Sequence, residues 1–99
     1  MCRLYAGQDP ATFAAETRSV RLNGQVTSLR LEAAFWDILQ EIAAREGMSL
    51  GRFLSQLHEE ILQLRGDVPN FASTLRVICL QDLRRRANID ALPAPLTAH

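Results

Sequence analysis

The chain has 99 residues, of which 11 are basic and 11 acidic, so its formal net charge is zero. A neutral balance excludes a general nucleic-acid coat, which is usually strongly basic, and any DNA binding must use positive charge that is concentrated locally. Since 47% of the residues are hydrophobic, a lot for one small domain, either the core is unusually apolar or part of the apolar surface closes an interface.

Two cysteines, Cys2 and Cys79, are too few for a disulfide framework. The N-terminus has no apolar run typical of a signal peptide, and nothing approaches a membrane span. The sequence therefore predicts a cytoplasmic protein, and no feature of it calls for a cofactor.

Residues 1–16 are predicted to form an N-terminal arm. Asp9-Pro10 is typical of a helix N-cap followed by proline at the first helical position, so a short helix through Glu16 is expected. Cys2, Leu4, Tyr5 and Phe13 give this arm enough apolar surface to dock. The main domain is expected over residues 17–87, followed by a flexible tail at 88–99 that contains two prolines.

A β-hairpin is predicted between residues 17 and 31, a stretch with three arginines and no acidic residue. Asn23-Gly24 separates two alternating runs, and this dipeptide is the strongest short hairpin signal. A two-residue loop pairs Leu22 with Gln25. One face then carries Val20, Leu22, Thr27, Leu29 and Leu31, and the other carries Ser19, Arg21, Val26, Ser28 and Arg30.

Three helices are predicted after the hairpin. The first covers residues 33–46 and stops at Gly47, the second follows the cap residue Ser49 and breaks at 66–69, and the third runs from the cap residue Asn70 to about Ala87. Their apolar stripes are Phe35, Ile38, Leu39 and Ile42; Leu50, Phe53, Leu54, Leu57, Ile61 and Leu64; and Phe71, Leu75, Ile78 and Leu83. No internal repeat is expected.

Several residues invite a functional interpretation that the pattern does not favour. Cys2, His58 and Cys79 lack the spacing of a metal site, so no metal is predicted. His58 with Glu59 and Glu60 is interpreted as a solvated helix face, and no nucleophile–base pair indicates catalysis. The short basic run Arg84-Arg85-Arg86 is expected to complement a helix C-terminus, and Trp36 is expected to pack over the sheet or at a dimer seam.

Three segments together resemble a known family: Thr27-Ser28-Leu29-Arg30-Leu31-Glu32, then Phe35-Trp36, then the stretch from Glu41 to Leu50 with its Gly-x-Ser turn. The chain resembles the Arc/MetJ/CopG-like ribbon-helix-helix superfamily, and within it a bacterial group with an Arg-Ser-Val stretch before the strand and a third helix. The resemblance covers roughly residues 18–83. It implies a mainly α homodimer with a short β ribbon, in which the strand at 27–31 pairs with the same strand of a second copy.

The resemblance also implies double-stranded DNA as the partner, with the ribbon in the major groove. Val26, Ser28 and Arg30 would then read bases, and the start of the second helix, at Ser49, Leu50, Gly51 and Arg52, would hold a phosphate. Arg18 and Arg21 are further candidates for DNA contacts.

A second hypothesis is a dimeric protein-interaction module on the same fold that does not read the groove, with the third helix docking another protein. The hairpin motivates it, because two paired hairpins give four strands and a width of about 19 Å, whereas the major groove is about 12 Å wide.

Overall fold

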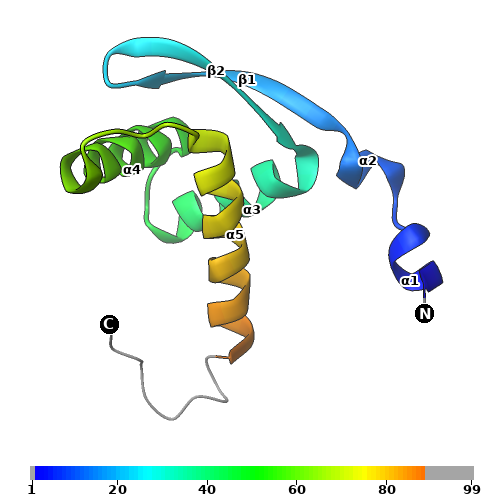
Figure 1. The fold of residues 1–99 in the computed structure, drawn as a ribbon. Coiled ribbons are helices and arrows are strands. Elements are labelled where there is room, and N and C mark those ends of the chain that lie inside the picture. Colours follow the sequence, from blue (N-terminus) through cyan, green and yellow to red (C-terminus); the bar gives the residue numbers. More distant parts are fainter. Residues whose placement is uncertain (1, 89–99) are drawn as a thin grey trace.

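The computed structural model describes residues 2–88, apart from the side chain of Cys2, so the predicted tail beyond Asn88 lies outside the described residues. Two short helices, α1 (Cys2–Ala6) and α2 (Pro10–Phe13), precede the strands β1 (Ala15–Leu22) and β2 (Gln25–Glu32) (Figure 1). Three longer helices follow: α3 (Ala33–Arg45), α4 (Leu50–Arg65) and α5 (Phe71–Asn88). The predicted fold class, mainly helical with a short β ribbon and an additional C-terminal helix, is confirmed.

The ribbon is an antiparallel hairpin made within one chain, with β1 and β2 paired from Ala15–Glu32 to Leu22–Gln25. This is the predicted register. Asn23 and Gly24 have φ values of 54° and 82°, as the two central residues of a type I′ turn require. Asparagine and glycine tolerate this left-handed backbone, so the local sequence determines where the ribbon turns.

One face of the ribbon covers the three long helices, with α4 packed against β1 and with α3 and α5 packed against β2 (Figure 1). Leu22, Leu29 and Leu31 on this face are at most 6% exposed. They join a single core with side chains from every long helix, which are Trp36, Leu39, Ile42, Leu54, Phe71, Leu75 and Cys79. The apolar side of the ribbon is therefore buried by the chain's own helices.

Trp36 joins β1 to α3. Its side chain is 1% exposed, and its indole Nε1 donates a hydrogen bond of 2.9 Å to the backbone oxygen of Glu16. The guanidinium of Arg18 lies 4.7 Å from the indole ring centroid, within the range of a cation–π contact. Trp36 thus packs over the sheet, as expected, and ties the first strand to the helical layer.

The helix boundaries follow the predicted capping residues. Gly47 and Gly66, with φ values of 72° and 88°, end α3 and α4 in the left-handed conformation typical of a C-terminal stop. The Ser49 hydroxyl accepts a hydrogen bond from the Arg52 N–H at 3.1 Å. Asn70 Oδ1 accepts one from the backbone N–H of residue 73, also at 3.1 Å.

The N-terminal arm differs from the prediction. Helix α2 ends at Phe13 rather than Glu16 because the ribbon already begins at Ala15, and α1 was not predicted. The side chains of Leu4, Tyr5 and Phe13 are 57–68% exposed, so the arm does not bury its apolar surface on its own chain. Figure 1 shows α1 at a distance from the helical layer.

Two residues assigned to the inner stripes face outward instead. Leu64 is 84% exposed, because it lies in the last turn of α4, where none of the described elements covers it. Leu83 is 41% exposed, and the inward position beside it is taken by Asp82, which is 8% exposed. The prediction for these two leucines was wrong because helical periodicity alone does not show where a neighbouring element ends.

Asp82 is buried because two arginines hold it between α3 and α5. Arg45 Nη2 donates to Oδ1 at 2.6 Å, and Arg86 Nε lies 3.3 Å from Oδ2. Arg86 also pairs with Glu41 of α3 at 3.2 Å. Arg86 therefore links two helices, and with Arg85 it also lies in the last turn of α5, where the basic run was expected.

His58 is half-buried, which corrects the prediction of a solvated face. Its ring meets Phe71 edge to face with centroids 5.0 Å apart, and its Nδ1 is buried without a hydrogen-bond partner among the described residues. The neighbouring carboxylates Glu59 and Glu60 are exposed. His58 therefore serves packing between α4 and α5.

We expect Trp36→Phe to lower the free energy of unfolding by about 1–3 kcal/mol, because it removes the indole donor and leaves the partly buried Glu16 oxygen without a partner. Urea unfolding followed by circular dichroism measures this. The control is Tyr5→Phe, which changes an exposed aromatic side chain. Equal midpoints for the wild type and Trp36→Phe would contradict the tie between β1 and α3.

The buried thiol of Cys79 is expected to make the free energy of unfolding depend on pH. It is 0% exposed, its Sγ lies 3.8 Å from the Phe35 oxygen, and burial, followed by the negative charge of Asp82, raises the pKa of its thiol to about 11. Because this pKa is higher in the folded state than in the unfolded state, the stabilising contribution is complete below the unfolded value and is lost as the pH rises toward 11.

In a Cys2→Ser background we therefore expect the urea midpoint to fall between pH 8 and pH 10.5. The added substitution Cys79→Ala should flatten that fall. An equally steep fall in both proteins would show that another group causes it.

Candidate nucleic-acid interface

The outward face of the ribbon presents three cross-strand pairs to solvent. Thr17 lies opposite Arg30, Ser19 opposite Ser28, and Arg21 opposite Val26. All six residues are exposed, and Val26 is 65% exposed. The structure thus brings the predicted base readers Val26, Ser28 and Arg30 together with Arg21 on one surface. Thr17 was missed by the sequence prediction, although the alternation from Ser19 would have placed it on this face.

The charge of this face is positive. Arg21 and Arg30 form no ion pair with any described residue, so both guanidinium groups are available to a ligand. The carboxylate at the end of the face, Glu32, binds Arg76 Nε at 3.1 Å. A backbone hydrogen bond at Glu32 and the hydrogen bond from Arg76 lower the pKa of this carboxyl, with Arg30 contributing least. The neutral chain therefore carries a local positive surface on its ribbon.

Arg18 lies on the opposite face from Arg21 and Arg30. It is stacked on Trp36 and pairs with Glu16 at 3.5 Å. The structure therefore separates Arg18 from the other two arginines, and a DNA contact by Arg18 stays a prediction with no geometric support.

The start of α4 has the geometry of an N-cap, as predicted. The Ser49 hydroxyl accepts a hydrogen bond from the Arg52 N–H. The N–H groups of Leu50 and Gly51 are the first of the helix and have no intrahelical acceptor. Ser49, Gly51 and Arg52 are exposed, and Leu50 is half-buried. Two free amides beside a cationic side chain suit an anionic oxygen. The cap is confirmed, and the phosphate contact stays a prediction.

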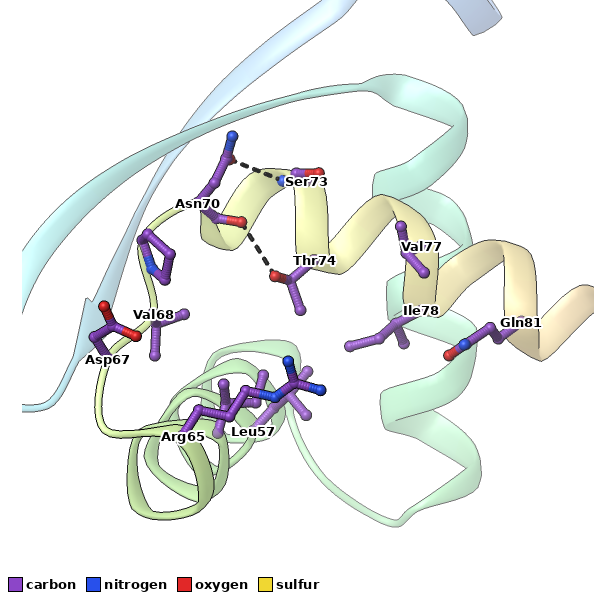
Figure 2. A pocket seen from close by; sticks show the side chains of 12 residues that line it. Leu57, Arg65, Asp67, Val68, Asn70, Ser73, Thr74, Val77, Ile78 and Gln81 are labelled. Carbon is purple, nitrogen blue, oxygen red and sulfur yellow. Dashed lines mark hydrogen bonds between the residues drawn. The ribbon is translucent and has the colours of Figure 1, made fainter. Parts of the chain in front are cut away.

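A groove of about 590 Å³ lies between α4 and α5, on a different part of the molecule (Figure 2). Leu57, Ile61, Val68 and Ile78 make it apolar, and Figure 2 shows Arg65 and Asp67 among the polar side chains around it. Among the described residues that line the groove, no nucleophile and base form a pair. Within residues 3–88, no three His, Cys, Asp or Glu side chains gather as metal ligands would.

A strand with a polar outer face, followed by two helices that are joined at a glycine turn, is the element order of the ribbon-helix-helix class. The family model for the ribbon-helix-helix domain matches residues 15–83, and the chain belongs to this family. Domains of this family typically act as dimers and bind DNA, and the family is a non-enzymatic fold group.

Among solved structures, the chain is similar to an uncharacterized protein from Bordetella pertussis Tohama I. The two share 41% sequence identity with a TM-score of 0.87, over 99% of this chain and 78% of that one. A search of curated proteins found no match. Across residues 2–88, no helix is long and apolar enough to cross a membrane.

Proposed function

We propose that this protein is a sequence-specific DNA-binding transcriptional regulator whose ribbon enters the major groove. The observation that carries this proposal is the outward face, where two arginines without an ion pair to any described residue stand exposed with two serines on a ribbon two strands wide. Strands lie about 4.8 Å apart, so such a ribbon fits a groove about 12 Å wide. The match to a family whose domains commonly bind DNA supports the same conclusion.

The outward side chains have distinct roles in this proposal. Arg30 takes two hydrogen bonds from a guanine, Ser28 donates to or accepts from a base edge, and Val26 contacts a thymine methyl group. The cap of α4, from Ser49 to Arg52, holds a backbone phosphate, which sets the register of the protein on the duplex without reading sequence.

A homodimer is part of the proposal, but its contact surface has to leave the ribbon two strands wide. Pairing through the outer edge of β2, which the sequence predicted, adds two strands and makes a sheet of about 19 Å. Helix α5 offers another surface, since Val77, which also lines the groove, recurs with Leu80 and Leu83 every three residues, and the three side chains are 41–49% exposed. We assign the dimer contact to this row.

The same row favours the second candidate function, a protein-interaction module that keeps the fold without reading DNA. Singly exposed hydrophobic side chains are ordinary, but three in a row on one helix indicate a contact surface. In either case we propose a cytoplasmic binding protein that is neither an enzyme nor dependent on a cofactor.

Arg30→Ala separates the two functions. With fragments of the source genome in a gel-shift assay, we expect saturable, specific retardation by the wild type that falls steeply with salt. Arg30→Ala should weaken specific binding about 5- to 150-fold, because it removes a bidentate contact worth about 1–3 kcal/mol, and should change nonspecific binding far less.

The control is Arg65→Ala, which removes one exposed arginine from the far end of α4. Equal loss of specific and nonspecific binding in Arg30→Ala would show that Arg30 does not read bases. Absence of specific retardation by the wild type would overturn the DNA-binding proposal in favour of the interaction module.

A further inference from the structure

The two strands of the ribbon carry related seven-residue sequences that are identical at three positions, a short repeat that the expectation of no internal repeat missed. Residues 16–22 read Glu-Thr-Arg-Ser-Val-Arg-Leu, and residues 25–31 read Gln-Val-Thr-Ser-Leu-Arg-Leu. Serine, arginine and leucine are identical at their positions. Three further positions pair similar shapes: Glu with Gln, Thr with Val, and Val with Leu. Strand alternation alone repeats only the polar and apolar character, so the repeat contains more than a hairpin needs.

The register turns this repeat into symmetry. Because Ser19 pairs with Ser28, a two-fold axis through that pair exchanges β1 with β2. A rotation about this axis maps the position of Arg21 onto that of Arg30. The outward face therefore has an arginine at each of two diagonal corners and the two serines at its centre. The same rotation maps Thr17 onto Val26. The symmetry is approximate because threonine has a hydroxyl group where valine has a methyl group.

The chain's own helices hold both strands of this ribbon in place. On β1, Leu22 is 5% exposed, and the backbone oxygen of Glu16 accepts a hydrogen bond from the indole N–H of Trp36. On β2, Leu31 is fully buried. The Ala33 N–H also donates to the Ala14 oxygen at 2.8 Å, which fixes the open end of the hairpin. Releasing β1 to make room for a partner strand would therefore expose core and break these hydrogen bonds.

We propose that one chain reads a pseudo-palindromic DNA element by itself, with β1 acting as the second reading strand that a partner would otherwise supply. Thr17, Ser19 and Arg21 then contact bases as equals of Val26, Ser28 and Arg30. This inference rests on the proposed function and names the kind of duplex that the ribbon recognises.

The spacing of the two arginines sets the form of that element. Arg21 lies opposite Val26, four residues along β2 from Arg30. Four residues span about 13 Å of strand, which corresponds to about four base pairs at 3.4 Å each. Because a two-fold axis relates the arginines, they meet guanines on opposite DNA strands. The element therefore has a G·C pair at each end of a stretch of about four base pairs.

Selection from a pool of short duplexes with a randomised centre tests the proposal, using the wild type, Arg21→Ala, Arg30→Ala and the double variant. We expect the wild type to select both G·C pairs. Each single variant should lose preference for one pair, with binding to the wild-type element weakened about 5- to 150-fold, and should keep the other. The double variant should keep neither, whereas Arg65→Ala should select the wild-type element.

A ribbon built from β2 of two chains gives a different result, because Arg30 then occupies both ends. In that case Arg30→Ala loses both G·C pairs and Arg21→Ala loses neither, which would overturn the inference while leaving DNA binding intact. Failure of the wild type to enrich any duplex would instead overturn the proposed function, and the inference with it. Circular dichroism of the variants checks that these exposed substitutions leave the fold unchanged.

Discussion

The pairing of β1 with β2 within one chain is the constraint on which the rest of the structure depends. An isolated two-stranded ribbon is marginally stable, so it has to lay one face on a core. Here Leu22, Leu29 and Leu31 supply that face, and all three long helices contribute side chains beneath it. Trp36 then fixes the first strand to α3 through the Glu16 oxygen. The ribbon and the helical layer of the chain therefore stabilise each other.

The same pairing determines what the outer face offers. Alternation along the strands leaves Arg21 and Arg30 in solvent, without an ion pair to any residue between 2 and 88, whereas Arg18 lies on the opposite face and stacks on Trp36. A chain with no net charge thus gathers positive charge where a duplex can approach. In the proposed mechanism the side chains of this face read the base sequence, and the N-terminal cap of α4 holds a phosphate and so fixes the register of the protein on the duplex.

Local signals in the sequence were sufficient for most of the fold. Asn23-Gly24 set the hairpin register, and Gly47, Ser49 and Asn70 marked helix ends, because each effect depends on the nearest few residues. Leu64 and Leu83 were misplaced, since burial depends on which element lies opposite. The symmetry of the outward face was also missed, because a seven-residue repeat gains meaning only when the register brings Ser19 and Ser28 together.

The most direct test of the central claim is an isotope-filtered NMR experiment on a mixture of labelled and unlabelled protein. It separates nuclear Overhauser contacts within one chain from contacts between chains. An in-chain ribbon predicts cross-strand contacts between residues 15–22 and 25–32 within the labelled chain, and no contacts between β2 strands of different chains. Intermolecular contacts along residues 27–31 would contradict the account, because they would show that a second copy completes the ribbon.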